Sequence, residues 1–188
     1  MAGKSGVRIN KVGTQQMLDA MSLLGGVEVL VGFPEDTADR PQGDTHLTNA
    51  TLGYIHDNGA PEQNIPARPF MAPGIEAARE KLANKLGQTM RAVLYKGGDA
   101  GTVEQGMTHV GLIAKLSIQN AINEGVPPPL AKSTLMARAR RGRKGAIQEL
   151  DRRWDGQEPS TEFAKPLVDT GQMRNAVNYA IRSKKNRK

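Results

Sequence analysis

Hydrophobic and polar residues alternate in two short segments of the chain. The first covers residues 27–33 and the second residues 176–182. A period of two is typical of a strand with one buried face, so each segment predicts one strand. The side chains that share a face are Val27, Val29, Val31 and Phe33 in the first, and Val177, Tyr179 and Ile181 in the second.

Four other segments have the spacing of three to four residues that is typical of amphipathic helices. The longest are residues 73–94, which open on a proline, and residues 102–124, which begin Thr-Val-Glu-Gln and stop before Gly125. That opening tetrapeptide fits a capping box. Shorter helices are expected over residues 14–24 and from Thr48 or Asn49 to His56.

The remaining segments predict arms and connectors. Residues 34–46 are polar, with four acids, and predict a mobile loop. Residues 60–73 contain four prolines and predict an extended connector. A basic helical segment is expected over residues 134–144, while residues 145–165 are polar and anchored only by Trp154.

These elements predict an α+β fold in which a small antiparallel or mixed sheet packs on two long helices, with extended arms and loops. The length of 188 residues suits a single domain with a core of its own. We expect that domain over residues 14–182, with a mobile loop at 34–46 and a basic and polar insertion at 138–165. A flexible arm over residues 1–13 and a basic tail over residues 183–188 flank it.

Composition excludes several kinds of site. The chain has no Cys, which removes disulfides, thiolate metal sites and Cys nucleophiles. Its three His lie far apart in sequence. The adjacent His56 and Asp57 are interpreted as part of a turn, and the glycine-rich stretch 97–101 as a plain loop, since it lacks the phosphate-loop pattern. We therefore expect no enzymatic activity, no cofactor and no metal, and no segment is apolar enough to predict a membrane span.

The basic residues are concentrated in the second half. Residues 1–94 hold nine Lys and Arg against ten Asp and Glu, whereas residues 95–188 hold 17 against nine. One cluster lies in the C-terminal tail and the other is Arg138, Arg140, Arg141, Arg143 and Lys144. This second cluster can neutralise nucleic-acid phosphates, contact an acidic partner, or form a solvated face. Aromatics are only 4%, so any contact with DNA is expected to be electrostatic rather than based on stacking.

Two sequence elements resemble a family of phage virion proteins. The first is Gly53-Tyr-Ile-His56-Asp-Asn-Gly59-Ala-Pro61 followed by Ile65-Pro-Ala-Arg68-Pro-Phe70-Met, and the second is Pro166-Leu-Val-Asp169-Thr-Gly171-Gln-Met-Arg174 before the last strand. Together they resemble the tail-completion, or head–tail joining, proteins of long-tailed bacteriophages, also described as virion morphogenesis or minor tail proteins. Met71 and Met173 stand where the family commonly has Leu, a volume-conserving change.

The resemblance implies a structural protein of the phage neck or upper tail, assembled in the host cytoplasm and then part of the virion. It implies a homo-oligomeric ring, with six copies expected, that completes the tail and joins it to the DNA-filled head. Its partners would be connector, terminator and tail-tube subunits, with non-specific contact to DNA in the channel. The alternative is a basic nucleic-acid-binding protein that uses residues 138–144 and 182–188.

Ten residues of the two elements are candidate interface residues. They are Tyr54, His56, Ile65, Pro66, Arg68, Pro69, Phe70, Asp169, Thr170 and Gly171. The prolines around Arg68 favour a rigid extended arm that docks on a neighbour and offers Arg68 to an acidic group there. The equally weighted alternative is that residues 65–70 pack only on their own domain, with Phe70 in the core. For Asp169, Thr170 and Gly171 a simple capped turn is favoured over an interface role.

Overall fold

The computed structural model describes residues 11–34 and 48–184, and it has the α+β fold that the sequence predicts. Helices dominate and a two-stranded antiparallel sheet accompanies them. In chain order the elements are α1 Lys11–Gly25, β1 Val27–Gly32, α2 Asn49–Asn58, η2 Pro61–Gln63, α3 Met71–Ala77, α4 Arg79–Lys96, α5 Ala100–Glu124, α6 Lys132–Arg140, α7 Lys144–Trp154, α8 Gln172–Ala176 and β2 Asn178–Ser183.

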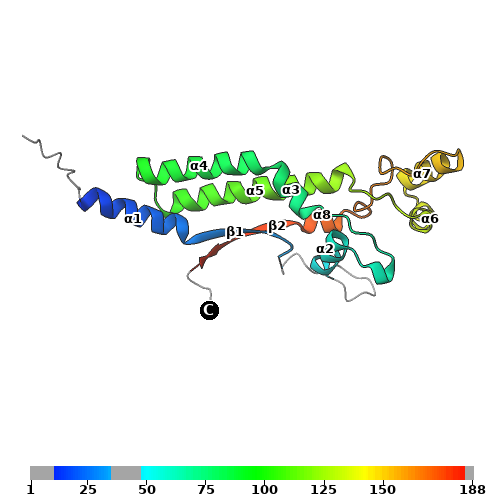
Figure 1. Cartoon of the computed structure of the whole chain (residues 1–188), viewed down its shortest axis with the longest axis horizontal. Coiled ribbons are helices and arrows are strands. Elements are labelled where there is room, and N and C mark those ends of the chain that lie inside the picture. The colour runs from blue at the N-terminus through cyan, green and yellow to red at the C-terminus, as the bar shows by residue number, and fades with distance from the viewer. Residues whose placement is uncertain (1–10, 35–47, 185–188) are drawn as a thin grey trace, which may run out of the picture.

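The two predicted strands pair with each other. β1 runs antiparallel to β2, with Val27 opposite Ser183 and Gly32 opposite Asn178. Figure 1 shows this ribbon along one side of α5 and helix α4 along the other. The core is continuous through these layers, because Val27 and Val29 of the ribbon join one cluster with Val93 of α4 and with α5. The alternation in the sequence therefore assigns the buried face correctly.

Helix α5 approaches its neighbours closely because glycines face them. A Cβ added at Gly106 would lie 2.3 Å from the Thr89 side chain of α4, and one at Gly111 would lie 2.3 Å from the Tyr179 ring of β2. Side chains at these positions would push the layers apart. The glycines thus set the spacing of the main body.

A second, smaller lobe lies at the end of the molecule opposite α1 (Figure 1). Helices α6 and α7 pack on each other around a separate cluster of buried residues. Its members are Leu130, Leu135, Ala146, Leu150 and Ala164. This α6–α7 lobe includes α7 and the end of α6 from the predicted basic and polar insertion 138–165, but it begins before that region, at Leu130.

Several predicted boundaries are corrected. The helix expected over 73–94 is two helices, α3 and α4, because the backbone hydrogen bonding changes at Ala78. The basic segment expected over 134–144 is helical only to Arg140 and then turns before α7 begins at Lys144. At the start of α5, Asp99 rather than Thr102 is the N-cap, and Thr102 returns the hydrogen bond as its third helical residue.

The predicted arms fall partly outside the described residues. Of the arm 1–13, residues 11–13 belong to α1 and residues 1–10 lie outside the described part, as do 35–46 of the loop and 185–188 of the tail. Ser183 ends β2, and the Lys184 N–H donates to the Gly26 carbonyl at 2.8 Å, so the ribbon continues into the start of the predicted tail. Within the described ranges, no helix is both long and apolar enough to cross a bilayer.

Candidate functional site

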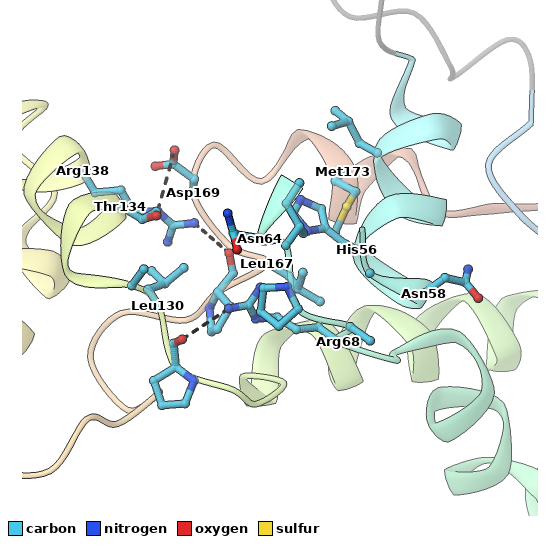
Figure 2. Close-up of a pocket in the computed structure, with 18 of the residues that line it drawn as sticks. His56, Asn58, Asn64, Arg68, Leu130, Thr134, Arg138, Leu167, Asp169 and Met173 are labelled. Atoms are coloured by element: carbon cyan, nitrogen blue, oxygen red, sulfur yellow. Dashed lines mark hydrogen bonds and ion pairs between the residues drawn. The ribbon is translucent and has the colours of Figure 1, made fainter. Parts of the chain in front are cut away.

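A groove of about 840 Å³ lies between the body and the α6–α7 lobe, and both sequence elements line it. One wall is the end of α2 and the segment 59–68 that follows it. The extended connector expected over residues 60–73 is corrected here, because the chain turns through η2 and Asn64 to pair Ile65 with Ala60, and α3 begins at Met71. The other walls are residues 129–134, leading into α6, and residues 166–173, leading into α8. Figure 2 shows the lining side chains, with Arg68 and Arg138 directed into the same region from different walls. Segments about 100 residues apart in sequence thus form one site, as is usual for ligand and partner sites.

Main-chain and carboxylate hydrogen bonds connect residues 68–71, at the end of this wall, to α2. The Arg68 N–H donates to the His56 carbonyl at 2.7 Å, and Asp57 Oδ1 accepts from the backbone N–H groups of Phe70 and Met71 at 2.7 and 3.1 Å. Asp57 therefore satisfies N–H groups at the start of α3, where no local side chain caps the helix. Gly59 has a φ of 81° and leaves no room for a Cβ, which would lie 2.7 Å from the Ala67 nitrogen.

Arg68 is a buried cation held by neutral acceptors. Only 6% of the residue is exposed. Its Nε donates to the Pro128 carbonyl at 2.9 Å and one terminal nitrogen donates to the Pro129 carbonyl at 3.3 Å. Burial, and secondarily the charge of Arg138, lower the pKa of this guanidinium. Within residues 11–34 and 48–184 the structure shows no ion pair between Arg68 and a carboxylate.

Arg138 occupies the opposite wall and ties the lobe to the segment before α8. Its guanidinium donates to the carbonyls of Lys165, Pro166 and Val168 at 2.9, 2.7 and 3.0 Å. Burial lowers the pKa of Arg138, while Asp169 acts in the opposite direction. This residue therefore fixes the fold of the groove.

Asp169 is the carboxylate at the centre of an arginine cluster. Arg141 and Arg143 approach it to 2.8 and 3.1 Å, and Arg138 Nε lies 4.0 Å away. Three of the five charges in the predicted basic cluster thus converge on one acid of the same chain. Arg140 and Lys144 remain exposed.

The structure places most of the predicted interface residues around the groove, but one lies in the core and two are exposed outside the groove. His56, Ile65, Pro66, Asp169, Thr170 and Gly171 line the groove along with Arg68. Pro69 is exposed but does not line it, and Tyr54 is 70% exposed on α2. Phe70 is fully buried in the main core, where its ring meets Phe33 edge to face at 6.4 Å.

Three side chains of this region are held within their own chain. Phe70 lies in the core, as one of the two alternatives for residues 65–70 has it, and the Arg68 guanidinium donates to carbonyls of its own chain rather than extending from a free arm. Likewise, Arg138 is 8% exposed, and its guanidinium donates to three carbonyls of its own chain. Apolar and charged residues in an extended segment are compatible with either arrangement, which is why the sequence leaves the choice open.

Asp57 and Glu149 are structural carboxylates that the sequence pattern does not reveal. The pattern places Asp57 only in a turn directly before Asn-Gly. In the structure its carboxylate accepts a hydrogen bond from the backbone N–H of Phe70, thirteen residues later, at the start of α3. Glu149 is fully buried between Arg152 and Arg153 in the lobe. No sequence pattern distinguishes a buried Glu in Q-E-L-D-R-R from an exposed one.

No family model matches the chain, and no curated protein or solved structure shows detectable similarity to it. Among residues 11–34 and 48–184 there is no group of three or more side chains placed to hold a metal.

The Asp57→Ala variant is expected to lower the free energy of unfolding by about 1–3 kcal/mol, since two N–H groups at the start of α3 lose their acceptor. Urea unfolding followed by circular dichroism measures the change. Glu62→Ala, an exposed substitution on η2, is the matched control and should stay within about 0.5 kcal/mol of the original chain. Equal stability of both variants would show that water replaces the carboxylate without cost.

Proposed function

We propose that this protein is a ring-forming structural subunit of a phage neck or upper tail, which completes the tail and joins it to the DNA-filled head. The resemblance of the two sequence elements supports the place in the virion. The observation that carries the assembly role is the apolar surface that the described part of the chain leaves uncovered. The proposal includes no catalytic step.

Helix α1 is the clearest part of this surface. Met17, Leu18 and Met21 are 48%, 55% and 58% exposed, while Ala20 is the buried contact of the helix with the body. Burying a Leu or Met side chain in an interface contributes about 1.5–3 kcal/mol to the free energy of association. A contiguous apolar face of this kind is typical of a protein–protein interface, and a neighbouring copy of the ring would cover it.

The alternative of a nucleic-acid-binding protein receives less support from the geometry. Asp169 and three backbone carbonyls already engage Arg138, and Asp169 also pairs with Arg141 and Arg143. Arg138 is thus held inside the chain, and phosphates could contact only the exposed members of the cluster. A DNA affinity that falls steeply with salt, and that Arg140→Ala with Lys144→Ala abolishes, would favour the alternative.

We expect the triple variant M17Q/L18Q/M21Q to weaken self-association at least 100-fold while the monomer stays folded. A loss of about 3 kcal/mol of association free energy, from apolar side chains no longer buried between copies, corresponds to that factor. Light scattering gives the mass and negative-stain microscopy the ring. The control Q15A/Q16A/D19A changes polar positions of the same helix and should still assemble.

A wild-type chain that stays monomeric at high concentration contradicts the ring. Mass spectrometry of purified phage particles provides the second measurement, and absence of the chain from particles contradicts the virion role.

A further inference from the structure

The groove carries more positive charge than the described chain neutralises. Arg68, Arg138 and Asp169 line it, and Arg141 and Arg143 lie beside it, where both pair with Asp169. Arg68 and Arg138 are both more than nine-tenths buried, and the second destabilises the charge of the first. A buried cation held only by neutral carbonyls is favourably placed to receive an anion.

The lining indicates what kind of anion fits. Around the two guanidiniums the walls are apolar, formed by Ile65, Pro66, Pro129, Leu130 and Leu167. Polar side chains, among them those of Asn58, Asn64 and Thr134, also line the groove. A groove with apolar walls, dispersed polar groups and buried cations matches an extended peptide that carries carboxylates better than a small inorganic ion.

A segment with this chemistry exists in the chain itself. Residues 35–44, which lie outside the described residues, contain Glu35, Asp36, Asp39 and Asp44 with a single Arg40. Their net charge of −3 equals in magnitude the +3 of four arginines and one aspartate at the groove.

The described residues that flank that segment lie near the start of α2. Phe33 packs against Gly53 of α2, and Thr48 is the N-cap of α2, whose other end lines the groove. The intervening residues 35–47 can span up to about 43 Å when extended. This reach extends well beyond α2, which is about 15 Å long.

We infer that the groove is the docking site for the acidic segment 35–44 of a neighbouring copy of this chain. Carboxylates of the segment compensate Arg68, whose own acceptors are neutral carbonyls, and the half-exposed Arg141 and Arg143, which share the single carboxylate of Asp169. Its uncharged residues pack on the proline-rich walls. The inference rests on the proposed ring, which supplies the neighbouring copy. It gives the two sequence elements a common role, because both build the receiving groove.

Peptide binding tests the groove separately from the ring. The probe is a fluorescent peptide of residues 34–47, added to the full chain carrying E35Q/D36N/D39N/D44N so that its own segment does not compete. We expect micromolar binding by fluorescence anisotropy, weakening with salt, and at least tenfold weaker binding after R141A/R143A, two half-exposed positions. The matched control peptide carries the same four amide substitutions and should not bind. Equal binding of both peptides, or none of the acidic one, overturns the inference.

Cross-linking identifies the copy that supplies the segment. Because the chain has no Cys, single variants D39C and T134C can be mixed, one of them enlarged by a tag, and treated with a bismaleimide. A mixed dimer at high yield is expected, whereas D39C with K96C, at the far end of α4, should give little. If the double variant D39C/T134C links only within one chain, the segment docks in its own molecule and the inference is overturned.

The two proposals fail in different ways. A ring that forms without the D39C–T134C cross-link overturns the docking site and leaves the ring. A monomeric chain that binds the peptide and forms the mixed cross-link overturns the ring and retains the docking site.

Discussion

Replacing Arg138 with methionine is expected to lower the free energy of unfolding by about 3–5 kcal/mol, the usual cost of breaking a buried charged network. Methionine keeps part of the volume but leaves the carbonyls of residues 165, 166 and 168 without their donor. Asp169 also loses one of its three cations. Urea unfolding in the absence of any nucleic acid measures the change.

The matched control for this variant is Arg140→Ala, because Arg140 is exposed on the same helix and belongs to the same basic run. Its stability should differ from the original by about 0.5 kcal/mol or less. If the two variants were equally stable, the carbonyl cage around Arg138 would contribute nothing, and the basic run would be a uniform charged surface.

The second large effect is expected at Glu149, the fully buried carboxylate of the α6–α7 lobe. Arg153 Nε lies 2.8 Å and Arg152 Nε 3.3 Å from its oxygens, and the Ser160 N–H donates to it at 2.8 Å. Removing it in Glu149→Ala leaves these donors without an acceptor, so we expect a loss of about 3–5 kcal/mol. Asp151→Ala, exposed on the same helix, should change stability by no more than about 0.5 kcal/mol.

Glu149 also predicts how the lobe responds to acid. Burial raises the pKa of this carboxyl, but the hydrogen bonds from Ser160, Arg153 and Arg152 outweigh it, and the pKa is lowered in the folded chain. Its stabilising contribution is therefore present at pH values above the ordinary glutamate pKa and is lost as the pH falls through the lowered folded-state value. Trp154 emission, from the last residue of α7, should report this loss, and Glu149→Gln should flatten the pH dependence. A pH profile unchanged by that substitution would contradict the assignment.

The elements that can be predicted from sequence are those whose apolar residues repeat with a regular period. In residues 27–33 and 176–182 the large apolar side chains of one face recur at every second position, so the strands and their buried face follow from the amino-acid pattern, although β2 begins only at Asn178. Helix α7 escapes prediction for the opposite reason. Its core contact includes the carboxylate Glu149 paired with two arginines, so the segment looks polar although it is folded. Trp154, expected to anchor the region, is 64% exposed instead.

The groove, too, can be predicted from the sequence only in part. Both of its motifs stand out in the sequence, because proline-rich and Asp-Thr-Gly stretches are locally distinctive. The sequence does not show that Arg68 donates to residues 128 and 129, or Arg138 to residues 165–168. Those acceptors are backbone carbonyls, which every residue possesses and which leave no trace in composition. Buried arginines therefore look like surface charge in the sequence.

The pairing of β1 with β2 has a consequence for how the molecule is made. The two strands lie roughly 150 residues apart in sequence, and contacts of such long range form late in folding. During synthesis the α4–α5 hairpin can close while β1 still lacks its partner. The valines of β1 and the facing side of α5 stay uncovered until residues 178–183 emerge. The main body can therefore close only after both strands have been synthesised.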